Sequence, residues 1–490
     1  MFLNKSNQDE CLKILNEVIN IGVDTKVNNK FKEKNFNIND NKELFNTPKN
    51  GQEINSLLND FKNNIIPYCS NFSNSKFMSF PDAGNSVAGL TGAIMADFLQ
   101  QNLINSSFCA PIATYMEIAV IKWLREVVGY ESKEIKNIWD VGGIITYGGT
   151  GSNSTAMMLA RENHRLNTMT NGVTNAKDYI TIIPKGIGHY SIKSASMWLG
   201  LGNNIIEVKT NNFKYDLDEL RKTLIQYKGK VMCVVAYVGD SRTMTIDNLE
   251  GIYNLVKSID KNIWLHADAC HGFSLGFSEK HKSKIKGIEK FDSISTDPHK
   301  VLDLPYCLSA LLIKNPESFK KITSTSDLIM QEDYAFGQIT PFIGSKSWVS
   351  LKLWFVFKNL GIDGIGKMID DRLEMAQKLK NKVINSNNFI LLNNVDINSV
   401  VFMYAPSDIK YNVEKLNNLN LMIHNEMSKE GEYHLHKFSL EDNNGVVEKD
   451  AIVYPLRYMS GNPNIKEKDL DDMLEYIKQL GEKIYNEQIV

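Results

Sequence analysis

Residues 291–301 read FDSISTDPHKV, and the organisation of the chain is clearest when followed outward from this stretch. Its short run of alternating apolar residues predicts a strand, and Asp297 and Pro298 favour a turn directly after it. We therefore expect Lys300 on a stiff loop at the end of a strand, and not on the surface of a helix. An ordinary solvent-exposed lysine is the alternative that the residue type alone leaves open.

Two features upstream change the interpretation of this lysine. Asp268 ends the apolar run 263–267, and residues 142–153 read GGIITYGGTGSN before a helical pattern. Glycine lets a backbone approach an anion closely, and the free N–H groups at a helix start favour a phosphate. The loop has neither the Walker lysine nor the G-x-G-x-x-G spacing, which argues against a nucleotide site. A plain helix cap for the glycines and a capping carboxylate for Asp268 are the alternatives.

A lysine, a strand-end carboxylate and an anion-binding loop are together the parts needed to hold pyridoxal 5′-phosphate. The cofactor aldehyde needs an amine, its ring nitrogen needs an acid, and its phosphate needs backbone N–H donors. His189 lies just before a helical pattern and could stack on the cofactor ring, or could simply cap the helix. His434 and His436 share one face of a strand-like run, but without a third ligand they predict no metal site.

Length and composition limit the class of protein. The 490 residues predict two or three lobes, and 43% hydrophobic with 23% charged residues is typical of a soluble globular enzyme. The net charge of −2 favours neither nucleic acid nor an anionic membrane surface, and no apolar run approaches the ~20 residues of a membrane span. Six scattered cysteines and a polar N-terminus lead us to expect reduced thiols in a cytoplasmic protein.

Strand-like and helical patterns alternate between residues 143 and 268, which predicts βαβ units and a mostly parallel sheet with helices on both faces. Residues 1–90 contain helical patches separated by polar linkers. After residue 374 a helix, strand-like runs and a final helix indicate a smaller α+β lobe. We therefore predict three parts: an N-terminal helical segment (1–90), a large α/β domain (91–374) and a small C-terminal domain (375–490).

Seven stretches together resemble the group II pyridoxal-phosphate-dependent amino-acid decarboxylases, which include glutamate, aromatic-amino-acid and histidine decarboxylases. They are FMSFPDAGNSVAGL, GGIITYGGTGSN, HYSIKSA, HADACHG, DPHK, GSKSWVSLKLW and PLRYMSGNP, and the resemblance runs from about residue 77 to the C-terminus. The HADA and DPHK pair in this order is its most specific part. It implies a fold-type I α/β transferase with a mostly parallel seven-stranded sheet, and a homodimer in which residues 1–90 wrap the partner.

The resemblance also implies roles for individual residues. Lys300 would form a Schiff base with the cofactor, Asp268 would pair with the ring nitrogen, and His189 would stack on the ring. Tyr334 would be the catalytic proton donor, with a plain surface tyrosine as the alternative. The full set of cofactor positions implied is Thr150, Gly151, Ser152, His189, Ser241, Asp268, His299 and Lys300.

Several positions depart from the family pattern, and they concern the substrate more than the cofactor. Asp82 stands where an uncharged residue is usual, and the segment QNLINSSFCAPIA offers Leu103 and Asn105 in place of aromatic contacts. With Phe80 and Arg457, these residues form the expected substrate set, although Arg457 could instead form a structural ion pair. Asp82 and Asn105 suggest a substrate with a polar or cationic side chain; simple repacking around an ordinary site is the alternative.

Other departures lie closer to the cofactor loops. They are Asp240, Cys270, His271, Lys346 and Ser347. The leading prediction is nevertheless a decarboxylase that converts an L-amino acid into an amine and CO₂. An aldehyde synthase or a C–C lyase on the same fold is the second hypothesis, and a cofactor-free binding or regulatory protein is the third.

Overall fold

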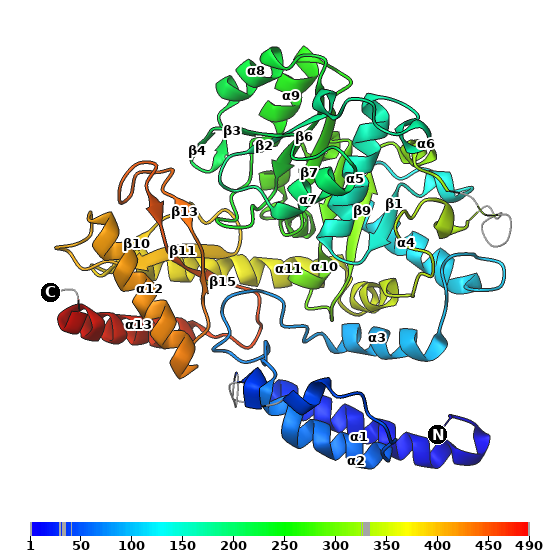
Figure 1. Cartoon of the computed structure of the whole chain (residues 1–490), viewed down its shortest axis with the longest axis horizontal. Helices are drawn as coiled ribbons and strands as arrows, with labels where there is room; N and C mark the ends of the chain where they lie inside the picture. The colour runs from blue at the N-terminus through cyan, green and yellow to red at the C-terminus, as the bar shows by residue number, and fades with distance from the viewer. Residues whose placement is uncertain are drawn as a thin grey trace.

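The computed structural model describes residues 2–28, 31, 36–40, 42–324, 326 and 334–488. A seven-stranded sheet forms the centre of the larger part of the molecule (Figure 1). In spatial order its strands are β1 (Gly143–Thr146), β9 (Ser309–Ile313), β8 (Ser293–Thr296), β7 (Trp264–Asp268), β6 (Val231–Tyr237), β2 (Ile180–Pro184) and β3 (Ile205–Val208).

Strand β9 pairs antiparallel with both β1 and β8, and the other pairs in this sheet are parallel. Every residue of β6, β7 and β8 is buried, because helices cover both faces of the sheet. The predicted α/β fold with a mostly parallel seven-stranded sheet is confirmed. Strand β9 was not predicted: its run SALLI is short and continuously apolar, so it carries no alternating pattern.

Three of the helices around this sheet, α7, α8 and α9, begin at a residue whose side chain caps the helix. The Asp216 carboxylate accepts hydrogen bonds from the first backbone N–H groups of α8, and Asn248 does the same for α9. The helices of this part are α4 (Pro111–Val127), α5 (Gly149–His164), α6 (Thr168–Asn171), α7 (Tyr190–Trp198), α8 (Leu217–Gln226), α9 (Leu249–Ile259) and α10 (Pro298–Val301). A small hairpin, β4 (Thr210–Asn211) and β5 (Lys214–Tyr215), precedes α8.

The long helix α11 (Ser350–Ile384) connects the large sheet to the C-terminal part, and it kinks at Gly361, where φ is 65°. Beyond it lie β10 (Phe389–Leu391), β11 (Ser399–Tyr404), α12 (Val413–Glu430), β12 (His436–Lys437), β13 (Leu440–Glu441), β14 (Ile452–Val453), β15 (Leu456–Met459) and α13 (Glu467–Gln488). Strands β10, β11, β15 and β12 form one sheet, with β13 and β14 paired separately.

Two hydrophobic cores meet along α11. Leu373 belongs to the core of the large sheet, whereas Ala376, one turn further, belongs to the core of the C-terminal part. The chain therefore changes lobe within a continuous helix, close to the predicted boundary at residue 374. The proposed division into three parts stays a prediction.

The predicted N-terminal segment, residues 1–90, contains α1 (Gln8–Val27) and α2 (Ile54–Asp60), and α3 (Val87–Leu99) runs across its boundary. Helices α1 and α2 lie side by side at the bottom of Figure 1, apart from the large sheet, and α3 packs against α11. In the described part of the chain, no helix has the length and apolar character needed to cross a bilayer.

Candidate active site

A pocket of about 400 Å³ opens at the carboxyl ends of the parallel strands. This is the edge where open parallel sheets present ligand-binding groups, because each strand there is followed by a loop. Its walls include predicted residues from five strand ends or the loops that follow them: Thr150 after β1, His189 after β2, Ser241 after β6, Asp268 at the end of β7, and His299 and Lys300 after β8.

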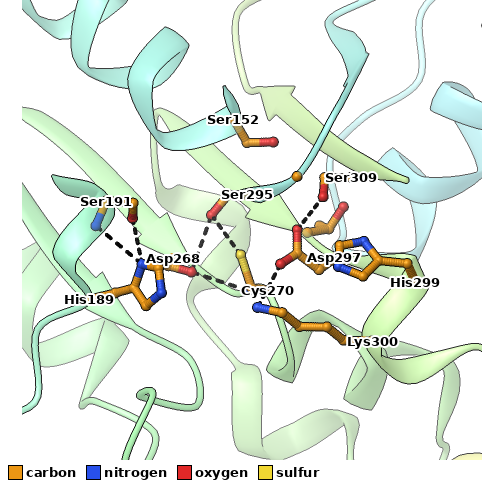
Figure 2. Close-up of polar contacts among 12 residues, drawn as sticks. Ser152, His189, Ser191, Asp268, Cys270, Ser295, Asp297, His299, Lys300 and Ser309 are labelled. Carbon is orange, nitrogen blue, oxygen red and sulfur yellow. Dashed lines mark hydrogen bonds and ion pairs between the residues drawn. The ribbon is translucent and has the colours of Figure 1, made fainter. Parts of the chain in front are cut away.

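Lys300 forms an ion pair with Asp297, which lies one turn before it (Figure 2). The Nζ–Oδ2 distance is 2.8 Å, and the Lys300 side chain is 27% exposed against 1% for Asp297. Burial alone would raise the pKa of Asp297, but the charges of Lys300 and His299 outweigh it and lower the pKa to about 2. Burial likewise opposes the charge of Lys300, yet Asp297 raises its pKa. Lys300 is therefore held as an ammonium by the ion pair with Asp297.

The start of α5 forms a cradle that only glycine permits. Gly148 precedes the helix with φ of 92°, and a Cβ on Gly149 would lie 2.8 Å from the Cys270 sulfur and 2.9 Å from the Asp297 carboxylate. The first N–H groups of a helix have no acceptor within it, so they are available to an anion. Gly148, Gly149 and Thr150 line the pocket and fit a phosphate.

Two predicted cradle residues do not line this pocket. The Gly151 amide donates to the Gly148 carbonyl at 3.0 Å, within the first turn of α5. Ser152 is fully buried, and its hydroxyl lies 2.7 Å from the Thr146 hydroxyl. The geometry therefore favours a cradle shifted toward Gly148, and the roles predicted for Gly151 and Ser152 gain no support from it.

Asp268 ends β7 as a buried carboxylate inside a network of donors. The Asn153 amide donates to Oδ2 at 2.9 Å, and the Cys270 amide and the Ser295 hydroxyl approach Oδ1 at 3.4 Å. Asp268 therefore fits the acid that a pyridine nitrogen requires. Asn153 was missed by the sequence reasoning, because in the sequence it reads only as part of a helix start.

His189 caps α7 and also lines the pocket, and its stacking on a cofactor ring stays a prediction. Its Nδ1 accepts from the Ser191 amide at 3.3 Å and lies 2.7 Å from the Ser191 hydroxyl. Its backbone amide donates to the Tyr237 hydroxyl at 2.9 Å. Burial lowers the pKa of His189, and the nearby Asp268 only partly opposes this effect. A neutral imidazole at this wall is suited to lie against an aromatic ring.

Arg457, on β15, contributes a guanidinium to the far side of the pocket. Its Nη1 donates to the Ser241 carbonyl at 2.5 Å, and the rings of Phe80 and Phe438 cover it. Its Nε has no hydrogen-bond partner among the described residues. Burial lowers the pKa of Arg457 to about 10, so it remains a cation at neutral pH. These contacts leave it able to bind a carboxylate.

Asp82 also lines the pocket, and its carboxylate has one hydrogen-bond partner among the described residues. The Tyr306 hydroxyl donates to its Oδ2, whereas Oδ1 is buried with no hydrogen-bond partner within the described ranges. Burial raises the pKa of Asp82, and the Tyr306 hydroxyl opposes this shift. A donor supplied by a ligand would satisfy the second oxygen.

Three other predicted residues do not line the pocket. Leu103 is fully buried in the main core. The side-chain oxygen of Asn105 accepts hydrogen bonds from the backbone amides of its own turn at 3.2–3.5 Å. The Tyr334 hydroxyl donates to the Ile135 carbonyl at 3.4 Å, and its ring packs on Tyr115. Residues 327–333 of its loop lie outside the described residues. The roles proposed for these three side chains stay predictions.

Most departures from the family pattern have local structural explanations. The Asp240 carboxylate accepts from the backbone amides of Arg242, Thr243 and Thr245 at 2.8 Å, so it builds a turn and does not face the cofactor site. Cys270 and His271 line the pocket as buried side chains. Burial raises the pKa of the Cys270 thiol and lowers that of His271, so both are uncharged at neutral pH.

Residues 39–405 match the family model of the pyridoxal-dependent decarboxylase conserved domain. The chain belongs to this family. The amine, the buried acid and the glycine cradle described above fit the pyridoxal phosphate that the family uses. The predicted enzyme class and cofactor are thus confirmed: the protein is a pyridoxal-phosphate-dependent carboxy-lyase.

Known proteins similar to this decarboxylase differ in their substrates. It is 25% identical over 453 residues to an aromatic-L-amino-acid decarboxylase of Bacillus atrophaeus, covering 89% of this chain and 87% of that protein. It is 28% identical over 346 residues to an L-2,4-diaminobutyrate decarboxylase of Acinetobacter baumannii, covering 66% of each. The structure of the TDC of Oryza sativa with PLP and tryptamine superposes with a TM-score of 0.86 at 17% identity, covering 99% of this chain and all of that one.

Proposed function

We propose that this decarboxylase converts an L-amino acid into the corresponding amine and CO₂, with Lys300 as the residue that carries the cofactor. The observation that supports this most strongly is the position of Lys300 in α10, the short helix that follows β8. There it shares one pocket with the Asp268 acid and the glycine cradle of α5. Bound pyridoxal phosphate supplies a ring that takes up the electron pair left behind when CO₂ departs.

Other residues of the pocket would hold the cofactor and orient the substrate. Asp297 lies 2.8 Å from the Lys300 ammonium and would hold and orient this side chain at the cofactor site. Asp268 would keep a proton on the cofactor's ring nitrogen, and His189 would cover the ring. Arg457 would bind and orient the substrate carboxylate. Tyr334 remains our proposed proton donor, which requires that its loop reach a pocket by moving or from a second subunit.

The substrate class is a finer proposal, and it depends on Asp82. We propose a side chain that carries an ammonium group, because Asp82 Oδ1 is buried in the pocket region without a partner among the described residues. The similarity to a 2,4-diaminobutyrate decarboxylase agrees with this choice. Asn105 also suggested a polar substrate, but its side-chain oxygen accepts hydrogen bonds from backbone amides of its own turn, so it no longer supports this proposal.

A panel of L-amino acids tests both proposals. Diamino, acidic, aromatic and branched apolar substrates would be assayed with added cofactor for CO₂, amine, aldehyde and hydrogen peroxide. We expect one amine for each CO₂, and the highest kcat/KM for a diamino acid. Asp82→Asn should lower that value on the order of tenfold or more, because a charged hydrogen bond is lost. Aldehyde as the main product would favour the aldehyde synthase, and activity on apolar or aromatic substrates alone would refute the ammonium proposal.

We further propose that the enzyme is a homodimer. Apolar side chains remain exposed along α1 and along α3 with the start of α4, including Val23, Val87, Phe98, Phe108 and Ile112. Such surfaces are typical of protein–protein interfaces. Sedimentation at micromolar concentration should give twice the mass of the chain, and a stable monomer with full activity would contradict the proposal.

A further inference from the structure

A continuous chain of hydrogen-bonded side chains links His266 on β7 to two pocket residues, Asp268 and His189. His266 precedes Asp268 by two residues on β7, so both side chains lie on the same face of the sheet. The His266 Nε2 lies 3.0 Å from the Asn153 carbonyl oxygen. The Asn153 amide nitrogen donates to Asp268 at 2.9 Å and to the Ser191 hydroxyl at 2.8 Å, and Ser191 contacts His189.

Donor and acceptor roles along this chain follow from its two ends. The Asp268 side chain accepts from the Cys270 amide and the Ser295 hydroxyl, and the Asn153 atom that faces it is the NH₂ group, which donates at 2.9 Å. The Asn153 carbonyl oxygen then faces His266, whose Nε2 must carry a proton. The Nδ1 of His266 accepts from the hydroxyl of Ser293 at 2.8 Å. Burial lowers the pKa of His266 to about 4, so it carries only this one ring proton at neutral pH.

The same reasoning extends from Asn153 to the pocket imidazole. The Ser191 hydroxyl oxygen accepts the second N–H of Asn153, so its own proton points to Nδ1 of His189, 2.7 Å away. Nδ1 of His189 is thereby an acceptor, and the single proton of the neutral ring lies on Nε2. One amide group therefore determines the hydrogen-bonding state of both the acid and the imidazole.

We propose that Asn153 is a positioning residue of this enzyme, holding Asp268 as a hydrogen-bond acceptor and His189 as the Nε2-protonated imidazole, with His266 setting the direction of the amide. Asn153 acts on the cofactor through these two residues. Its own amide group bonds protein partners. Asn153, Ser191, His266 and Asp268 are buried, and His189 is half-buried at the pocket wall.

Asn153→Asp tests this role because it keeps the size of the side chain and removes the donor. Two carboxylates at 2.9 Å cannot both stay ionised, so they share a proton and Asp268 loses part of its charge. Pyridoxal 5′-phosphate titrated into the cofactor-free enzyme should bind on the order of ten- to hundredfold more weakly. The absorption spectrum of the bound cofactor, and the pH at which it changes, should shift as well.

Asn420→Asp is the matched control, since Asn420 on α12 is equally buried and bonds backbone groups of Tyr404 and Leu416 at 2.9 Å. It should lower thermal stability but leave cofactor affinity and spectrum unchanged. Asn153→Ala provides a second, smaller variant whose effect on affinity should have the same direction. If folded Asn153→Asp bound the cofactor with wild-type affinity and spectrum, the positioning role would be refuted.

The direction of the amide is tested at His266, which lies behind Asn153. His266→Leu removes the donor to the Asn153 carbonyl, so the amide can turn and present its oxygen to Asp268. We expect weaker cofactor binding with an altered spectrum, and recovery of both in His266→Gln, which keeps an N–H donor. Equal behaviour of the two variants would show that His266 only fills space. Binding is read directly, so neither result depends on which amino acid is the substrate.

Discussion

Lys300→Ala is expected to lower kcat for CO₂ release by about 10²–10⁴-fold or more, and to abolish covalent attachment of the cofactor. Lys300 is the only amine among the described residues that line the pocket, and its Nζ lies 2.8 Å from the Asp297 carboxylate. The variant also leaves Asp297 as a buried carboxylate without its cation, at the glycine cradle that must hold a phosphate. The loss of the Lys300 amine and the unpaired charge of Asp297 would both weaken binding of the cofactor.

Borohydride reduction followed by mass measurement of the protein provides the decisive readout. The wild-type chain should gain the mass of the reduced cofactor, and Lys300→Ala should not. Lys320→Ala is the control, because Lys320 belongs to the same lobe but is half exposed in a surface pair with Glu317. A Lys300→Ala protein that retained the covalent cofactor, or full activity, would show that another lysine carries it.

Glu117→Ala is expected to lower the free energy of unfolding by about 3–5 kcal/mol, the usual effect of removing one partner of a buried ion pair. Glu117 on α4 lies 2.6 Å from Lys346, with exposed fractions of 0% and 2%. The two charged atoms are close but not aligned as a hydrogen bond, so mutual charge is the main attraction. Without Glu117, the Lys346 ammonium stays buried, and the Ser350 hydroxyl loses its acceptor at 2.8 Å.

Urea unfolding of the cofactor-loaded protein measures this loss. Glu126→Ala is the matched control on the same helix, because the pair Lys122–Glu126 is about half exposed at 3.8 Å and should contribute about 0.2–1 kcal/mol. The double variant Glu117→Leu with Lys346→Met should recover most of the stability, since no charge is then left buried. A Glu117→Ala effect no larger than that of the control would contradict the assignment.

Lys346 and Ser347, two departures from the family pattern, each contact a partner in the large domain. Their positions differ from the family pattern, which gave no hint of a partner. In the structure Lys346 pairs with Glu117, and the Ser347 hydroxyl lies 2.5 Å from the Tyr147 hydroxyl in the loop after β1. Both contacts attach the segment before α11 to the large domain, so these residues support the fold.

The sequence by itself determined the cofactor, the family and the approximate position of the pocket. Lys300 and Asp268 could be placed in the same pocket because Asp268 ends β7 and Lys300 comes shortly after β8, which are local patterns of a few residues, although Lys300 lies in the short helix α10 and not in the expected loop. The carboxyl ends of parallel strands then meet at one edge without further information. The same local reasoning correctly gave the parallel sheet and placed His189 both at a helix start and in the pocket.

Only the tertiary structure decided which distant side chains complete the site. Asn153 is 115 residues from Asp268 in sequence, and Tyr306 is 224 residues from Asp82, so no local spacing connects either pair. Packing also turned the Ser152 hydroxyl toward Thr146, away from the predicted cradle. The physical reason is the same in each case: side-chain direction and donor–acceptor pairing depend on neighbours that only the folded chain brings together.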